Sequence, residues 1–178
     1  MKRWLLFSVF AAILAVGSPL PTVAQGQTRN ALLSDSDRVL KNLPGVAIVV
    51  EDLDKDAKAT GLNTAILEKY TELKLRADGI KVLSPKASVA LSDQPYIYLR
   101  LTVVRIPKSE VLIYSFDIKL DETLIRPSDQ KRITGCTIWS QEYTGAVANK
   151  TFPTAIHDVL KGFLHQFTTA YNKENAGK

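Results

Sequence analysis

The sequence predicts an α/β (α+β) fold, a two-layer sandwich in which a mixed sheet of about five strands carries two helices on one face. Three observations support this fold class. A strand, a helix and a second strand follow one another over residues 46–84, two strands with two-residue alternation occupy residues 95–120, and the chain ends in an amphipathic helix. The expected order of elements is β-α-β-β-β-β-α.

The amino terminus is typical of a secretory signal peptide. Two cations precede an apolar run over residues 4–16, and small residues then provide a cleavage site after Ala24. The run is too short to span a bilayer comfortably, so we expect residues 1–24 to be removed and the protein to be periplasmic or secreted. Residues 25–44 are mostly polar and predict a flexible leader that could hold one short helix, ahead of a single domain over residues 45–175.

Composition narrows the range of partners and cofactors. Cleavage removes Lys2 and Arg3 from the 23 basic residues, which leaves 21 against 18 acidic ones and no basic patch for nucleic acid. No second apolar stretch is long enough to span a membrane. The single cysteine, Cys136, excludes an internal disulfide framework and a multi-cysteine zinc site. We therefore expect no cofactor, no nucleic acid, and either a protein partner or a homo-oligomer.

The first half of the domain reads as a strand, a helix and a parallel strand. Residues 46–53 are apolar on both alternating sets and rich in β-branched side chains, which is typical of a strand covered on both faces. Asn63 suits a helix N-cap and Gly79 a left-handed C-cap, with residues 80–84 following as the next strand. The intervening helix has apolar residues at helical spacing, namely Ile66, Tyr70, Leu73 and Ala77.

The middle of the chain predicts a hairpin with a defined register. "PYIYLRLTVVRI" and "VLIYSFDIKL" flank the short "PKSE", and pairing Ile106 with Val111 fixes all other pairs. One face of the hairpin is then apolar and the other amphipathic. The apolar face pairs Ile97, Leu99, Leu101 and Val103 with Leu120, Ile118, Phe116 and Tyr114, and the other face pairs Tyr98, Arg100 and Thr102 with Lys119, Asp117 and Ser115.

A fifth strand and a long helix complete the domain. Residues 133–143 alternate so that Cys136 and Ile138 are expected to face the helices while Trp139 and Tyr143 face the other way. The last helix begins near residues 151–154. Its apolar side chains fall within a stripe about 120° wide that must lie on the sheet; they are Ile156, Val159, Leu160, Phe163, Leu164, Phe167 and Tyr171.

Three aspartates, Asp52, Asp54 and Asp56, form the one cluster with metal-ligand chemistry. A calcium loop of the helix-loop-helix kind has Gly as its sixth residue and a bidentate Glu as its twelfth, and here the loop would begin at Asp52. This chain has Ala57 and Asn63 there, so both tests fail. The loop is interpreted as a polar strand exit and helix cap, with a weak non-standard cation site as the alternative, because ligands bind at the C-terminal ends of parallel strands.

The sequence predicts no catalytic residue. His157 and His165 are eight residues apart on one helix, over about 11 Å along its axis, so they cannot chelate one metal together. Cys136 lies within a predicted strand, where a packed thiol is the usual finding. The nucleophile-elbow, P-loop and dinucleotide-binding motifs are absent. An enzyme built from scattered residues stays open as a minority interpretation.

A surface is the remaining candidate for function. If Trp139 and Tyr143 join Tyr98 and Arg100 on the sheet face away from the helices, that face has the aromatic and arginine side chains that anchor protein interfaces. The structural alternative is ordinary cross-strand pairing that covers the sheet, with Arg100 and Asp117 as an exposed ion pair. The binding interpretation predicts that Tyr98 and Trp139 are substantially exposed.

Several short stretches resemble a group of small exported bacterial proteins with no assigned activity. They are Gly61-Leu62, "LKLRADGIKV", "PYIYLRLTVV", "TIWSQ" and the final "FTTAYNKEN". More loosely, the element order is similar to small envelope-protein domains, such as the amino-terminal domain of the Tol translocation protein and domains of secretion-channel lipoproteins. These resemblances imply assembly and protein contact, and they supply no catalytic residue.

Two hypotheses about function follow. The first is a non-enzymatic periplasmic or secreted binding or assembly module that acts through an exposed sheet face or edge. The alternative is a small enzyme or ligand-binding protein with a site at the loop of residues 52–63, where its carboxylates would converge on a pocket.

Overall fold

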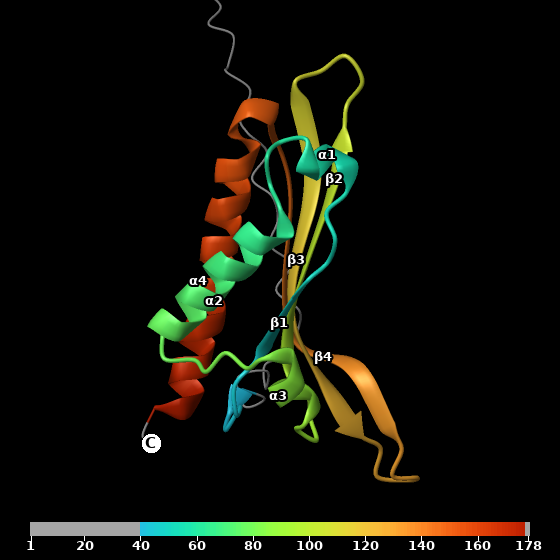
Figure 1. Ribbon diagram of the computed structural model, residues 1–178, viewed down its shortest axis with the longest axis vertical. Coiled ribbons are helices and arrows are strands. Elements are labelled where there is room, and N and C mark those ends of the chain that lie inside the picture. Colours follow the sequence, from blue (N-terminus) through green and yellow to red (C-terminus); the bar gives the residue numbers. More distant parts are fainter. Residues whose placement is uncertain (1–39, 177–178) are drawn as a thin grey trace, which may run out of the picture.

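The computed structural model describes residues 40–176, and Figure 1 shows a mixed sheet with two long helices on one face. The sheet has four strands in the order β1-β2-β3-β4, with β1 parallel to β2 and the other neighbours antiparallel. The strands are β1 (Ala47–Val50), β2 (Tyr96–Arg105), β3 (Val111–Ile125) and β4 (Arg132–Ala148). The helices are α1 (Lys55–Lys58), α2 (Thr64–Ala77), α3 (Pro85–Val89), the 3-10 turn η2 (Asn149–Thr151) and α4 (Phe152–Asn175).

The α+β class is confirmed, but the expected five strands and two helices are wrong. Residues 80–84 form only an isolated parallel bridge between Val82 and Val46. Ile80 and Leu83 both enter the core there, a three-residue spacing that a strand cannot use to bury one face. Ser84 then caps α3, with Pro85 in its first turn, so the extended backbone ends at once. In residues 40–176 the short helices α1 and α3 accompany the two long ones.

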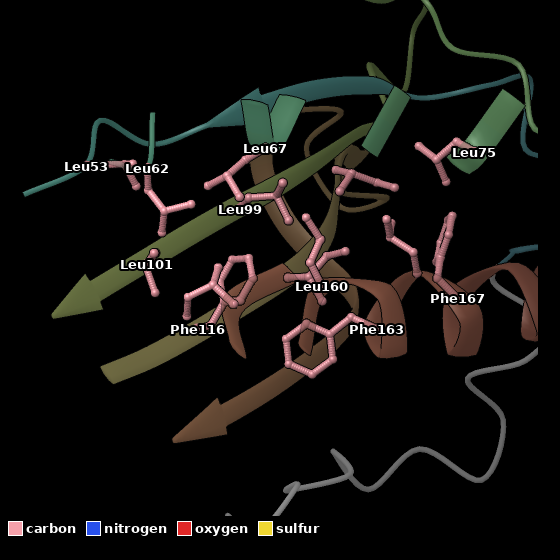
Figure 2. Packing of buried hydrophobic residues seen from close by; sticks show 14 of the residues in the cluster. Leu53, Leu62, Leu67, Leu75, Leu99, Leu101, Phe116, Leu160, Phe163 and Phe167 are labelled. Carbon is pink, nitrogen blue, oxygen red and sulfur yellow. The ribbon is translucent and has the colours of Figure 1, made fainter. Parts of the chain in front are cut away.

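The register of the β2–β3 hairpin is confirmed in full. Ile97 pairs with Leu120 and Val103 with Tyr114, while Arg100 pairs with Asp117 on the other face. The apolar set is buried under the helices, as Figure 2 shows for Leu99, Leu101 and Phe116. The hairpin therefore has the single apolar face that its two-residue alternation predicted.

Helix α2 turns a different face to the core from the one expected. Its buried residues are Leu67, Thr71 and Leu75. Of the predicted stripe, Ile66 and Leu73 are 51% and 55% exposed, Ala77 is exposed and Tyr70 only half-buried. The helix carries apolar residues on two sides, and sequence spacing alone did not identify the side that meets the sheet.

Helix α4 lies on the sheet through the predicted stripe. Ile156, Leu160 and Leu164 are fully buried, and Phe163 and Phe167 are nearly or fully so, while Val159 and Tyr171 lie half-buried at the margins. Phe163 meets Phe116 of β3 with ring centroids 5.8 Å apart. No helix in residues 40–176 is both long enough and apolar enough to cross a membrane.

The packed domain extends further toward the amino terminus than the sequence suggested. Leu40 and Leu43 are buried in the core, although both fall in the segment 25–44 that was expected to be a leader. The Asn175 side chain fixes this segment at the end of α4, since it accepts from the Asn42 N–H and donates to the Leu40 carbonyl. The expected signal peptide and residues 25–39 lie outside the described residues.

Truncating Phe167 to Ala should lower the free energy of unfolding by about 3–5 kcal/mol, because its buried ring would leave a cavity between α4 and the sheet. Urea unfolding followed by fluorescence measures this change. The matched control is Leu73→Ala on the exposed side of α2, which should cost under about 0.5 kcal/mol. Similar losses for both variants would contradict the described packing of α4.

Candidate binding surface

The sheet face away from α2 and α4, here called the outer face, has a polar centre. The Tyr98 hydroxyl donates a hydrogen bond to the Glu51 carboxylate, and this bond is the main reason that the pKa of Tyr98 is raised. Arg100 donates to Asp117 at 2.9 and 3.0 Å, and the Asp117 carboxylate raises the pKa of Arg100. The Asp117 side chain is only 8% exposed, so Arg100 neutralises a carboxylate that little solvent reaches.

One end of the outer face is apolar instead. Val104, Ile113 and Ala146 form one row across β2, β3 and β4. Val104 is 57% and Ile113 40% exposed. The row lies where β2 turns into β3, next to the last residues of β4. A partner on β4 would therefore reach exposed apolar surface at this end.

Trp139 and Tyr143 do not belong to the outer face, which corrects the sequence-based expectation. They pair with the buried residues Leu120 and Phe116, so their side chains point toward α4. The Trp139 ring packs on Phe167 with centroids 5.0 Å apart. Tyr143 stacks on Tyr114 at 5.9 Å.

A β-bulge explains the error. Leu120 pairs with Trp139 but Asp121 with Thr137, so Ile138 is an extra residue in β4. The alternation that starts at Cys136 reverses there, and every later side chain changes face.

The four predicted binding residues are therefore split between two faces. Tyr98 and Arg100 lie two residues apart on the outer face, whereas Trp139 and Tyr143 lie on the helix side. Both Tyr98 and Trp139 are half-buried, so the expectation that they are substantially exposed is wrong. The surface that was predicted from these four residues together does not exist.

The structure instead offers the free edge of β4. Among residues 40–176, strand β4 ends the sheet and pairs with β3 on one side only. The Asn149 N–H donates to the Glu110 carbonyl at 2.7 Å. Because an antiparallel ladder alternates, the odd-numbered residues from 139 to 147 bond to β3 and the even-numbered ones from 140 to 146 direct their N–H and C=O groups outward. Ala148 directs only its N–H outward, since its carbonyl accepts from the Thr151 hydroxyl at 3.1 Å.

The stretch of this edge that follows the bulge carries little of the usual protection against strand pairing. Natural edge strands are kept short, are twisted by bulges, or carry lysine, proline or several charges. Residues 139–148 contain no lysine or proline, and Glu142 is their one charged residue. The side of this edge that faces α4, here called the helix-side margin, is lined by half-buried Trp139, Tyr143 and Val147. An added strand would cover apolar side chains as well as pair the free backbone groups.

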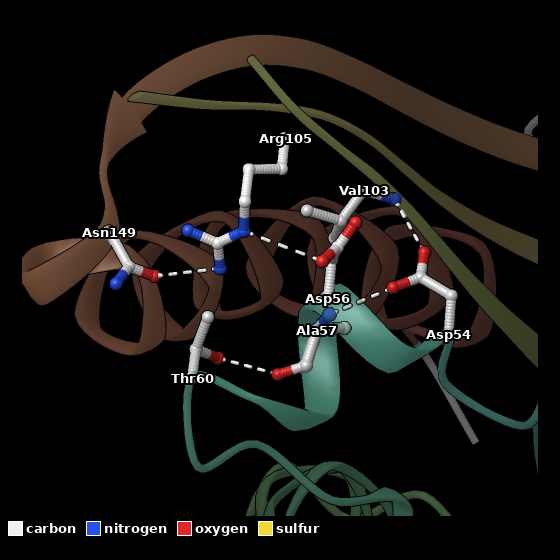
Figure 3. A network of polar contacts seen from close by, with 7 residues as sticks. All are labelled: Asp54, Asp56, Ala57, Thr60, Val103, Arg105 and Asn149. Carbon is white, nitrogen blue, oxygen red and sulfur yellow. Dashed lines mark hydrogen bonds and ion pairs between the residues drawn. The ribbon is translucent and has the colours of Figure 1, made fainter. Parts of the chain in front are cut away.

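The opposite edge of the sheet is protected. Strand β1 is four residues long, and beyond its end Asp54 accepts a hydrogen bond from the Val103 N–H of β2 at 2.8 Å. Figure 3 shows that the same carboxylate caps α1 through the Ala57 N–H, also at 2.8 Å. A side chain thus occupies the part of the β2 edge that the short β1 leaves unpaired.

The other two loop aspartates also have partners within the chain. Asp52 pairs with Lys58 at 2.8 Å, and the Lys58 hydrogen bond lowers the pKa of Asp52. Asp56 pairs with Arg105, which also donates to Asn149 (Figure 3). Within residues 40–176 there is no group of three or more metal-ligating side chains. The three carboxylates do not converge, which removes the geometric basis for a cation site at this loop.

A cavity of about 340 Å³ lies between the start of α2 and the first turns of α4. The expected loop contributes Gly61 and Leu62 to its wall, but none of the three aspartates lines it. Tyr70 and His157 meet there with ring centroids 4.2 Å apart. The cavity is mainly apolar, so it suits an apolar group and lacks a nucleophile paired with a base.

The remaining candidates for chemistry lie apart from that cavity. His165 is exposed on α4. Cys136 is a half-buried free thiol whose sulfur lies 3.4 Å from the Ile133 carbonyl oxygen, within hydrogen-bonding distance. The geometry assigns neither residue a reaction.

Comparison with known proteins adds little to this description. The chain matches no family model, and no curated protein matches it. Among solved structures it is similar to a PelC variant from Paraburkholderia phytofirmans, described as a dodecamer, with 15% identity, a TM-score of 0.43, and coverage of 82% of this chain and 97% of that chain. This likeness is too distant to carry an argument. The resemblance to small exported proteins stays a prediction.

Replacing Asp54 with Ala should lower the free energy of unfolding by about 2 kcal/mol, because the change removes a helix cap and leaves the Val103 N–H without its acceptor. Thermal or urea unfolding measures the loss. Asn63→Ala is the matched control, since Asn63 caps α2 and has no second role there, and should cost about 1 kcal/mol. Equal losses would show that the Val103 bond contributes nothing.

Proposed function

We propose that this protein is a non-enzymatic binding or assembly module that pairs an extended protein segment with the free edge of β4. The observation that carries the proposal is the stretch of residues 139–148, which directs unpaired backbone groups outward with Glu142 as its one charge. The signal-like amino terminus favours action in the periplasm or outside the cell. Protein contact is also the role that the resemblance to envelope domains implies.

Strand addition is the binding mode that suits this edge. Main-chain hydrogen bonds supply affinity in this mode, and alternate side chains supply specificity. A bound segment would place one set of its side chains beside Trp139, Tyr143 and Val147. Its other set would lie near Ala146 and the exposed Ile113 of the apolar row. The expected ligand is therefore a segment rich in β-branched or aromatic residues with little net charge.

The cavity between α2 and α4 supports a second candidate, a ligand-binding protein whose site adjoins the loop of residues 52–63. In its favour, Leu62 and the exposed Ile66 give the cavity an apolar entrance. Against an enzyme, the three loop carboxylates are engaged elsewhere. This candidate predicts small apolar ligands rather than extended peptides.

Peptides of about eight residues with alternating β-branched side chains should bind β4, and NMR titration of the amides should locate them. We expect the largest shifts at residues 142, 144 and 146, and loss of binding in Ala146→Pro. That substitution removes an outward N–H and leaves the ladder to β3 intact. Leu73→Ala serves as the control and should bind normally. Shifts confined to Ile66 and His157 would contradict the proposal and favour the cavity.

A further inference from the structure

We infer that the segment paired with β4 is β4 of a second copy, aligned antiparallel about a two-fold axis at Gly145. This inference rests on the proposed function of the edge as a strand-binding surface and names its partner. Antiparallel pairing of identical strands is self-complementary, so one surface closes the dimer without leaving a new edge. The product would be a continuous eight-stranded sheet with both helical layers on the same face.

The backbone of β4 fits this alignment. Glu142 would lie opposite the partner's Ala148, and Thr144 opposite the partner's Ala146. All of these residues are even-numbered, so each directs its N–H and C=O toward the new neighbour, except that the Ala148 carbonyl accepts from the Thr151 hydroxyl. The four pairs around the axis would exchange about six hydrogen bonds. A register displaced by one residue would place outward groups against groups already bonded to β3.

Charge selects among the registers that the backbone allows. Glu142 is the one charged residue in residues 133–149, and exposed Lys150 lies in the 3-10 turn two residues after the end of β4. With the axis at Gly145, Glu142 lies opposite the partner's Ala148, which brings it toward the partner's Lys150 and keeps the two Glu142 carboxylates apart. An axis at Glu142 would instead set the two carboxylates directly opposite each other, which is destabilising.

The side chains at the helix-side margin of the edge also fit the alignment about Gly145. Tyr143 would lie opposite the partner's Val147, an aromatic and β-branched pair of the kind that stabilises sheets. At the axis the two Gly145 residues would meet without side chains. A Cβ atom on Gly145 would lie 2.7 Å from the Tyr143 ring and 3.1 Å from the Tyr114 ring, so the aromatic packing already requires glycine there. The half-buried aromatic margin would become covered in the dimer.

Sedimentation of the exported form, residues 25–178, over a range of concentrations tests self-association. We expect a concentration-dependent dimer. Ala146→Pro should weaken the dimer by at least about tenfold. A monomer at every concentration would overturn the inference.

A second variant guards against misfolding of the proline variant. Thr144→Lys adds a charge at the edge without changing backbone freedom and should also weaken the dimer. Ala87→Lys adds the same charge on exposed α3, away from the edge, and should leave it intact. A dimer that survives both edge variants would overturn pairing through β4.

Cysteine crosslinking tests the register in a Cys136→Ser background. Paired residues on opposed strands have Cα atoms about 5.5 Å apart, within disulfide range. A mixture of the Thr144→Cys and Ala146→Cys proteins should give crosslinked heterodimers, whereas neither protein alone should crosslink efficiently. Efficient crosslinking of Thr144→Cys alone would place the axis at Thr144 and overturn the alignment at Gly145.

The outcomes separate this inference from the proposed function. Peptide binding to β4 in a protein that stays monomeric would refute the second copy as partner and leave the strand-binding role standing. If the protein neither dimerises nor binds peptides at β4, both the inference and the proposed function are refuted.

Discussion

The packing of α4 on β3 and β4 is the interaction on which the rest of the structure depends. Phe163 meets Phe116, Phe167 meets Trp139, and Phe152 meets Tyr114, so the helix contacts the sheet from its first residue to Phe167. Seven apolar side chains at about 1.5–3 kcal/mol each make this the main contribution to the core, as an upper bound. Because α2 and α4 share one face of the sheet, the apolar core lies on that side. The outer face and the β4 edge receive no covering element from residues 40–176.

The helices cover one face of the sheet and leave its two edges to other groups. The two edges differ in what occupies them. At the β1 side, the two carboxylate oxygens of Asp54 accept from the Ala57 and Val103 N–H groups, which both caps α1 and occupies the part of the β2 edge that β1 leaves unpaired. The acidic loop therefore has a structural role that accounts for its composition. At the β4 side the Thr151 hydroxyl engages only the Ala148 carbonyl at the end of the strand. Among residues 40–176 no further strand pairs with the rest of this edge, which carries one charge. The proposed strand addition at β4 depends on this contrast between the two edges.

The parts of the fold that the sequence predicted correctly are those where a single period is undisturbed. Two-residue alternation determined the β2–β3 register pair by pair, and three- and four-residue steps identified the buried stripe of α4. Prediction failed where two patterns compete. On α2, Ile66 and Leu73 are as apolar as Leu67 and Leu75, and only the tertiary contacts decide which pair is buried. Residues 80–84 have the composition of a strand, but Pro85 and the core positions of Ile80 and Leu83 leave room for one bridge. The free edge could have been suspected from the charge-poor stretch "TGAVA", but strand order was needed to show that it is an edge.

The bulge at Ile138 connects the largest error in the candidate site to its proposed role. With uninterrupted alternation, Trp139 and Tyr143 would lie on the outer face, and the helix-side margin of β4 would carry Ser140 and Thr144 instead. The extra residue reverses the pattern, so that aromatic side chains follow the margin while small residues such as Ala146 occupy the outer positions of the edge. Small outer residues allow another strand to approach, and half-buried aromatics gain further burial when it does. One inserted residue therefore converts a predicted aromatic face into an edge suited to strand addition.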